Sequence, residues 1–316
     1  MTIAPNVVPF MQSTLAPAGR EAELMASVFV WMAIGGLIIW AAVMLLAWYA
    51  PRAAEANNTR IQTALIFGGG VVFPVIVLLV LMIAGLRELP SILAPATDKT
   101  LALEVSGAQW WWRVRYLRPG HEPIELANEI RLPVGRRIDA TLTSLDVIHS
   151  FWVPSIAGKI DMIPGRVNRI ALEPTRIGTY RGACAEFCGA SHARMNLIAV
   201  VMQPEAFDRW LAGQARPASA PAEPIAQRGE AAFRAHGCNT CHTIRGTDAM
   251  GVNGPDLTHV GGRETLAAGL LPTRPEEFRR WISSTELLKP GVHMPAFSKL
   301  PDDTLHSLAT YLAQLQ

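Results

Sequence analysis

Residues 184–195 read Cys-Ala-Glu-Phe-Cys-Gly-Ala-Ser-His-Ala-Arg-Met, and this stretch is the most informative part of the central region of the chain. Two thiols, an imidazole and a thioether stand close together in it, at Cys184, Cys188, His192 and Met195. Soft sulfur and nitrogen ligands of this kind favour copper over hard cations. A Cys-x-x-x-Cys pair alone is weak evidence, but the complete string is specific. The stretch therefore predicts a copper site.

An earlier segment supplies a second histidine. The string Asp146-Val-Ile-His149-Ser-Phe-Trp-Val-Pro places His149 on an apolar stretch, where a histidine is more often a satisfied core residue than a ligand. The copper string, however, has one histidine too few for a symmetric site. We therefore interpret His149 as the missing copper ligand.

Residues 98–210, which contain both motifs, have the pattern of a β domain. Short apolar stretches recur at 101–105, 124–126, 138–142 and 197–202. Turn signals such as Arg118-Pro-Gly120 separate them, at a spacing typical of a β-sandwich. The next residues, 211–224, read LAGQARPASAPAEP, and a stretch so rich in alanine and proline predicts a semi-rigid linker.

From residue 225 to 316 the pattern becomes helical. Helices are expected at 227–236, 275–283 and 301–315. The string Cys238-Asn-Thr-Cys241-His242 is the attachment signature of c-type haem, in which two thiols bind the haem covalently and the histidine becomes an axial iron ligand. A zinc knuckle or a redox-active Cys-x-x-Cys is the alternative. A zinc site needs further ligands, and this region has no second cysteine pair.

The second axial ligand of the haem iron is expected downstream. Met294 lies in Gly291-Val-His-Met-Pro-Ala, a loop before the last helix rather than a helical stripe. His293 is the rival ligand, and Met250 lies too close to the attachment motif. Methionine ligation raises the haem potential, which suits electron transfer toward an oxidant. We therefore predict Met294 as the ligand.

The composition points to a membrane. Half of the 316 residues are apolar and only 17% are charged, whereas soluble domains carry about a quarter charged residues. Residues 24–50 and 61–86 contain no charged residue, and each run exceeds the roughly 20 residues that span a bilayer. Buried core helices are the alternative, but two such runs in succession are hard to cover with protein. Residues 24–97 therefore predict a two-span transmembrane hairpin.

The charges near the hairpin suggest its orientation. The first run is too long for a cleaved signal peptide, and no basic segment precedes it. The connector carries Arg52 and Arg60 against Glu55, which weakly favours a cytoplasmic connector and an outward-facing tail at 1–23. Since c-type haem is attached outside the cytoplasmic membrane, the haem motif favours the same topology. A net charge of +2 offers no electrostatic case for nucleic acid binding.

With these motifs in place, residues 24–210 resemble subunit II of the haem–copper cytochrome c oxidases, and residues 225–316 resemble class I cytochrome c. Their combination is similar to the caa-type subunit II, which has a fused C-terminal cytochrome c domain. The resemblance implies a multidomain membrane protein with a two-helix transmembrane hairpin. An all-β cupredoxin-like CuA domain and an all-α cytochrome c domain would follow it.

The resemblance also implies a ligand set for a binuclear copper centre, CuA. Cys184 and Cys188 would bridge the two coppers, and His149 and His192 would each cap one of them. Met195 would be a weak axial ligand, and Glu186 would contribute its backbone carbonyl. The Glu186 side chain would bind a magnesium ion shared with subunit I.

Other segments match the family outside the ligand set. In Gln109-Trp-Trp-Trp112, the resemblance makes Trp110 the point where electrons enter, and Trp111 stands where the family often has tyrosine. Pro255, in Gly-Pro-Asp-Leu, would support the axial histidine. Residues 158–166 match a segment near the surface of subunit I, and we interpret them as a docking segment.

The implied function is electron delivery in a proton-translocating cytochrome c oxidase. Electrons would pass from a cytochrome c donor through haem c and CuA to subunit I, where dioxygen is reduced to water. Subunits I and III and the lipid bilayer would be the partners. The protein would lie in a bacterial plasma membrane, with both cofactor domains on the periplasmic or outer face.

Other functions fit the sequence less well. A copper chaperone or sensor would have no use for a covalent haem. A nitrous oxide reductase needs a large histidine-rich domain, and the chain has only eight histidines. Quinol-oxidase subunits typically lack the copper ligands. A stand-alone haem–copper shuttle remains open, and co-purification with a many-spanning haem protein would separate it from an oxidase subunit.

Overall fold

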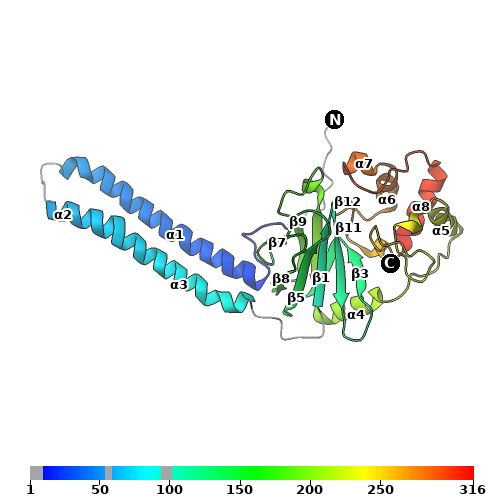
Figure 1. Ribbon diagram of the computed structural model, residues 1–316, viewed down its shortest axis with the longest axis horizontal. Helices are drawn as coiled ribbons and strands as arrows, with labels where there is room; N and C mark the ends of the chain where they lie inside the picture. The colour runs from blue at the N-terminus through cyan, green and yellow to red at the C-terminus, as the bar shows by residue number, and fades with distance from the viewer. Residues whose placement is uncertain (1–9, 54–58, 94–101) are drawn as a thin grey trace. The chain divides into compact units, whose positions relative to one another are not determined.

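The computed structural model describes residues 10–53, 59–93 and 102–316 (Figure 1). The first nine residues of the expected tail, part of the connector and the expected start of the β domain at 98–101 lie outside the described residues. Glu23–Pro95 forms one compact unit, and the rest of the chain forms another.

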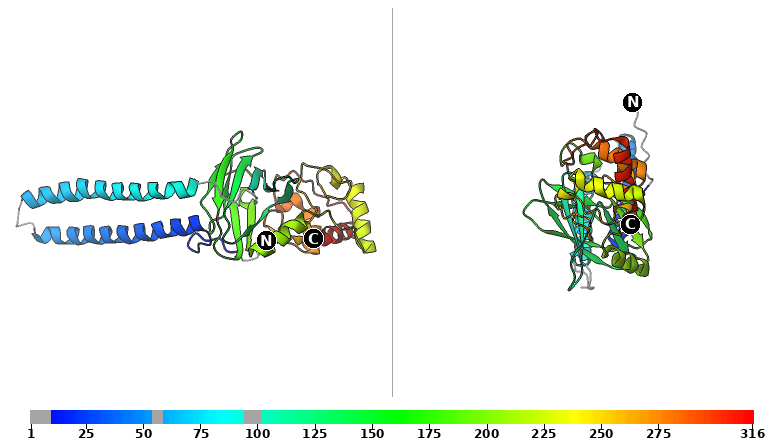
Figure 2. Two further views of the ribbon diagram at one scale, coloured as in Figure 1. Left: turned by 90° about the horizontal axis from the view of Figure 1, so that it is seen from below. Right: turned by 90° about the vertical axis from the view of Figure 1, so that its right-hand side faces the viewer.

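The first unit is an antiparallel pair of long apolar helices, seen from two directions in Figures 1 and 2. It contains α1 (Arg20–Tyr49) from Glu23 onward, η1 (Ala50–Ala53), α2 (Thr59–Ala64), η2 (Leu65–Val72) and α3 (Phe73–Leu93). Two helical stretches, Arg20–Arg52 and Thr59–Pro90, are long and apolar enough to cross a membrane. The second stretch contains π-helical turns in η2, and there the Phe73 amide bonds the Gly68 carbonyl just before Pro74. Irregular turns of this kind accommodate a proline inside a long helix.

Two five-stranded sheets form the sandwich of the second unit. One sheet has the order β3-β2-β1-β5-β8, and the other has the order β4-β10-β9-β6-β7. Their bounds are β1 (Ala102–Ala108), β2 (Trp111–Leu117), β3 (Ile124–Ala127), β4 (Glu129–Pro133), β5 (Ile138–Ser144), β6 (His149–Trp152), β7 (Ile160–Met162), β8 (Asn168–Leu172), β9 (Gly178–Cys184) and β10 (Asn196–Met202). Burial alternates along β1 and β2, because successive side chains point to opposite faces of a strand.

The sandwich brings the two copper motifs together. In the second sheet β6 pairs antiparallel with β9, and Phe151 lies opposite Cys184. His149, at the start of β6, therefore lies beside the cysteine at the end of β9, although 34 residues separate them along the chain.

The haem-motif domain packs its helices around an apolar core. It contains α5 (Pro224–Ala235), η4 (Cys238–Thr240), η5 (Val260–Gly262), the short pair β11 (Thr265–Leu266) and β12 (Leu271–Pro272), α6 (Pro275–Ser283), α7 (Thr285–Leu288) and α8 (Asp302–Gln314). Phe233 of α5 meets Tyr311 of α8 edge-on. Where α5 and α8 approach each other most closely, a Cβ on Gly229 would lie 2.0 Å from the Ser307 carbonyl oxygen. Position 229 of α5 therefore needs glycine.

The linker differs from the expectation at its start. Residues 211–214, expected in the linker, form the last turn of α4 (Pro204–Gln214), because Leu211 packs into the sandwich core. The following residues lie against the haem-motif domain. The Ala218 amide donates to the Arg245 carbonyl at 2.8 Å, and His259 Nε2 lies 3.0 Å from the Arg216 carbonyl. The linker is therefore bound to the domain that it connects.

Polar contacts join the sandwich to the haem-motif domain. Glu129, which is only 3% exposed, accepts hydrogen bonds from Arg131 Nε at 2.8 Å and from the Glu264 amide at 2.7 Å. Arg131 also donates to the Gly262 carbonyl at 3.0 Å. Burial raises the pKa of Glu129, and Arg131 partly offsets this effect.

Replacing Glu129 with alanine is expected to destabilise the second unit by about 3 kcal/mol, because it leaves a buried amide and a guanidinium without their acceptor. For a unit of this size the thermal midpoint should fall by roughly 6–12 °C, measurable by calorimetry of the full chain. Alanine at Glu122, an exposed carboxylate of the same domain, is the control. Equal midpoints for the two variants would contradict the assignment of Glu129 as an interdomain anchor.

Candidate metal centres

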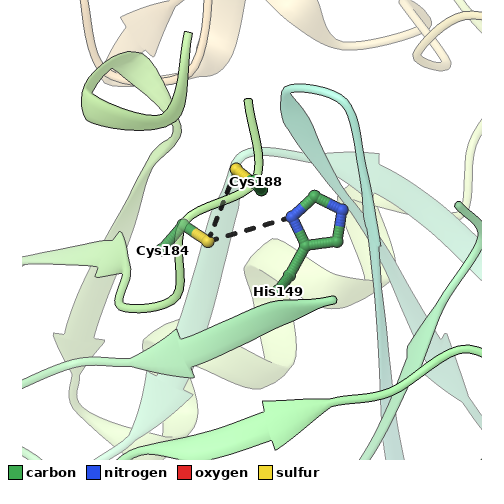
Figure 3. A group of neighbouring side chains, drawn as sticks. All are labelled: His149, Cys184 and Cys188. Atoms are coloured by element: carbon green, nitrogen blue, oxygen red, sulfur yellow. Dashed lines mark hydrogen bonds between the residues drawn. The ribbon is translucent and has the colours of Figure 1, made fainter. Parts of the chain in front are cut away.

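His149, Cys184 and Cys188 converge at one end of the sandwich (Figure 3). Cys184 Sγ lies 3.8 Å from His149 Nδ1 and 3.8 Å from Cys188 Sγ. The three ligand atoms lie within 4.8 Å of one another, and all three residues are buried. This is the arrangement required for a shared metal site.

The other donor atoms of the predicted copper ligands lie around the same two sulfurs. Cys184 Sγ is 3.1 Å from the Glu186 carbonyl oxygen. Cys188 Sγ is 3.5 Å from His192 Nδ1 and 3.9 Å from Met195 Sδ. The structure therefore brings all six predicted copper ligands together.

Contacts within the site shift the pKa values of its thiols and its imidazole. The hydrogen bond between the two sulfurs lowers the pKa of Cys184 well below that of a free thiol, and the neighbouring thiolate raises the pKa of Cys188. Burial lowers the pKa of His149, but its interactions with Cys184 and Asp146 outweigh burial and raise it. Asp146 Oδ1 lies 2.7 Å from His149 Nε2, which leaves Nδ1 directed at the sulfurs.

The residues fit a binuclear copper group. The two sulfurs are free thiols, and their 3.8 Å separation is far from the roughly 2.0 Å of a disulfide. Two sulfurs with a nitrogen donor on each side, a thioether and a carbonyl form a soft ligand set. Asp146 is a site residue that the sequence reasoning did not assign, although the pattern of a carboxylate three residues before a ligand histidine was available to suggest it.

The three consecutive tryptophans have different environments. Trp110 is 6% exposed, and its Nε1 donates to the Cys188 carbonyl at 2.9 Å. Trp112 is fully buried in the sandwich core, where it meets Phe151 edge-on. Trp111 is only half-buried, with the Arg113 guanidinium 5.2 Å from its ring centre. Trp110 is thus directly bonded to the copper loop, yet covered.

The haem motif is arranged for attachment. Cys238 is half-buried, Cys241 is exposed, and both are free. His242 Nδ1 donates to the Pro255 carbonyl at 2.8 Å, which leaves Nε2 as the metal-binding nitrogen. Burial lowers the pKa of His242, so that the imidazole is neutral, as a ligand must be. Next to the ring, a Cβ on Gly254 would lie 2.6 Å from His242 Cε1, so this position needs glycine. The arrangement fits a covalently attached haem whose iron His242 would bind.

Burial distinguishes the three candidates for the second axial ligand. Met294 is half-buried and packs against the core of the haem-motif domain. His293 is exposed, and Met250 is 78% exposed. Thr285 Oγ1 donates to the Met294 carbonyl at 3.0 Å and so holds the loop. The packing favours Met294 as the ligand.

Comparison with known proteins identifies the families of the two domains. Residues 118–202 match the family profile "Cytochrome C oxidase subunit II, periplasmic domain", and residues 226–316 match "Cytochrome c". A cytochrome c oxidase subunit 2 from Alkalihalophilus pseudofirmus is 35% identical over 69% of this chain and 62% of that protein. The subunit 2 of Branchiostoma floridae is 32% identical over 44% of this chain and 68% of that protein. The chain belongs to the cytochrome c oxidase subunit II family.

The chain and its relatives align over only part of their lengths. The subunit II chain described here spans only 62% of the length of the Alkalihalophilus relative. The crystal structure of the periplasmic domain of subunit II of cytochrome oxidase from Bradyrhizobium japonicum is 30% identical, with a TM-score of 0.35, and covers 38% of this chain and 95% of that one. In this subunit II the cytochrome c domain follows the copper domain, as the caa-type arrangement requires.

Proposed function

We propose that this chain is the electron-accepting subunit of a respiratory terminal oxidase. It would take electrons from a cytochrome c donor and deliver them to subunit I, where dioxygen is reduced to water with coupled proton translocation. The observation that supports the proposal is that one compact unit contains both the clustered copper ligands predicted from the sequence and the Cys-x-x-Cys-His motif of a matched cytochrome c domain. A chaperone or a sensor has no need of the second motif.

The residues of the chain hold and isolate the redox groups. When bound, binuclear copper and haem c supply one-electron carriers. Cys184 and Cys188 would bind the coppers, with His149 held in place by Asp146. Cys238 and Cys241 would bind the haem covalently, with His242 oriented by the Pro255 carbonyl. Because hydrogen bonds hold the His149 and His242 side chains in place, these ligands would move little when the redox groups gain or lose an electron.

An apolar surface beside the copper ligands supports docking on subunit I. Phe187, between the two cysteines, is 77% exposed, and Leu145, Val147 and Ile148 of the neighbouring loop are also exposed. Clustered exposed apolar side chains of this kind mark interaction sites. The Glu186 side chain is exposed on the same loop. We propose that it binds an interfacial magnesium ion, and that the complex also contains subunit III.

We propose that the chain is anchored in a bacterial plasma membrane with both cofactor domains on the outer face, and the two apolar helices support the membrane anchoring. The name of the matched profile, a periplasmic domain, agrees with this placement. We propose an N-terminal tail at 1–23, a transmembrane hairpin at 24–97, a copper domain from 98 and a cytochrome c domain at 225–316. The linker before the cytochrome c domain begins after Gln214, where α4 ends.

Metal analysis of the detergent-purified chain tests the proposal. Two coppers sharing one unpaired electron, together with one covalent c-type haem, are expected from copper analysis, haem analysis and paramagnetic resonance on one oxidised sample. A single localised copper, or no copper beside intact haem, would contradict the proposal. Co-purification with a many-spanning haem protein then separates an oxidase subunit from a stand-alone shuttle.

Replacing Met294 with leucine should leave the haem attached but lower its potential by on the order of 0.2 V, because axial ligands set haem potentials over a range of about 0.8 V. Reduction of the copper centre should slow as a result. Redox titration of the haem absorption measures the change, with Met250→Leu as the matched control on an exposed methionine. An unchanged potential would remove Met294 from the ligand set.

A further inference from the structure

Lys289, the residue that follows α7, is a buried lysine. It is only 2% exposed, and its Nζ donates a hydrogen bond to the Ala267 carbonyl at 3.1 Å. Within the part of the chain that the structure describes, no carboxylate pairs with it. Lysine is almost never fully buried unless it is paired, because an ammonium group loses its hydration when it leaves water. The buried positive charge therefore needs an explanation.

The residues on either side of Lys289 are bonded to the loop that carries the copper ligands. Arg194 donates to the Leu288 carbonyl at 2.8 Å, and Ser191 Oγ donates to the Pro290 carbonyl at 2.7 Å. These two donors stand on either side of a predicted copper ligand, the histidine at position 192. The main chain of Lys289 is thus fixed next to that loop.

The group that accepts from the ammonium is fixed to the same loop. The Ala267 carbonyl, which accepts from Lys289, is followed by the Ala268 carbonyl, which accepts from the Asn196 amide at 3.2 Å. Asn196 directly follows the predicted ligand Met195. Both the main chain and the ammonium group of Lys289 are therefore held against the loop of the copper ligands.

Two charged groups act on the Lys289 ammonium. The Cys188 thiolate attracts it, and the Arg194 guanidinium repels it. Burial lowers the pKa of Lys289 to about 7, Arg194 adds to this effect, and Cys188 opposes it. Among the described residues, the opposite charge that acts on the ammonium is thus a predicted copper-ligand sulfur and not a carboxylate.

The hydrogen bond to Ala267 does not require a charge. A neutral amide could donate to the same carbonyl without bringing an ion out of water. Replacing buried charges with apolar groups of similar volume is, moreover, often neutral or stabilising. The bond therefore explains where the Lys289 side chain lies, but not why this position carries a positive charge.

We propose that Lys289 supplies a fixed positive charge that raises the reduction potential of the copper centre. The centre gains one electron when it is reduced, so a nearby cation favours its reduced state. A unit charge about 10 Å from an added electron, at an effective dielectric constant of about 20, changes such an equilibrium by roughly tenfold. This inference rests on the proposed function, because it requires copper at the predicted ligands.

Redox titration of the copper signal in the full chain, with a mediator of known potential, tests this role without using activity. In Lys289→Met, which keeps an unbranched side chain but no charge, the equilibrium constant for copper reduction should fall by roughly tenfold. Titration at about pH 6, below the pKa of Lys289, keeps the parent side chain charged. Lys289→Arg restores the charge and should recover most of the loss. Equal potentials in Lys289→Met and the parent would overturn the proposal.

Lys299→Met is the matched control, because it removes the same charge from an exposed position of the same domain. Salt screens exposed charges far more than buried ones. The shift in Lys289→Met should therefore persist at high ionic strength, and Lys299→Met should leave the copper potential unchanged. Equal shifts in the two variants would show a general effect of net charge and would count against a specific role of Lys289.

A second variant covers the case in which Lys289→Met does not fold. Lys289→Gln keeps a donor for the Ala267 carbonyl but carries no charge, so the same fall in the copper potential is expected. If Lys289 only held the loop in place, the glutamine variant would keep the parent potential, and the proposal would be wrong. Failure of the proposed function gives a different result, since the two-copper signal would then be missing from the parent chain itself.

Discussion

Replacing Cys188 with serine is expected to remove the binuclear copper centre and to reduce oxygen consumption by the oxidase complex to background. Cys188 Sγ lies within 4 Å of donor atoms from three other predicted ligands, Cys184, His192 and Met195. Losing a residue that merely orients a metal ligand typically costs 10–100-fold in affinity or activity, and a bridging sulfur should cost more. Copper analysis and paramagnetic resonance measure the loss.

Two observations make this result specific. The haem should remain attached and reducible, because its motif lies in the other domain. Ser150→Ala, beside the ligand His149, is the control for a local change without loss of a ligand, and it should retain both coppers. A Cys188→Ser chain that kept two coppers sharing one electron would show that the bridging assignment is wrong.

Replacing both Cys238 and Cys241 with alanine is expected to abolish covalent haem and to unfold the domain that carries it. A class I cytochrome c domain packs its helices around the haem, so binding of the group and folding are coupled. The segment with Met294, which packs against the domain core, should then be released. Haem analysis measures the loss of covalent haem. Limited proteolysis, read as cleavage after residue 224, measures the unfolding of the domain.

The copper domain should survive this change. Its core consists of sandwich side chains such as Trp112, Val114 and Phe151, none of which comes from the haem domain. Retention of the copper signal alongside a protease-sensitive C-terminal domain is therefore expected. A protease-resistant, haem-free domain would show instead that the haem is not needed for this fold.

Much of the architecture was predictable because each local pattern has one dominant physical cause. Charge-free runs of membrane-spanning length predicted the two long helices. The interval 275–283 was predicted as a helix and is α6, since Pro275 opens it and its apolar side chains recur on one face. The proximity of the predicted copper ligands was predictable because the full Cys/Glu/Cys/His/Met string is rarely assembled for any purpose other than a shared site.

The remainder depends on contacts between distant segments, which the sequence does not display. The linker was expected to begin at 211, but Leu211 packs into the sandwich core and extends α4 to Gln214. Gly291 lies close to the Trp110 ring, where a Cβ would come within 2.8 Å of Cη2, although Trp110 lies 181 residues earlier in the chain. No local pattern relates such positions, and only the assembled fold shows that one covers the other.

The bound linker has a consequence for how the oxidase responds to its surroundings. Tethering by a short linker gives a partner domain an effective concentration in the mM range, and here the linker is also fastened along the domain by its Arg216 and Ala218 backbone. Under the proposed function, the copper centre would therefore face an electron donor whose local supply is set by the chain itself. Dilution, or depletion of free donor, would then change how often the haem is refilled but leave the step between the two domains unimolecular.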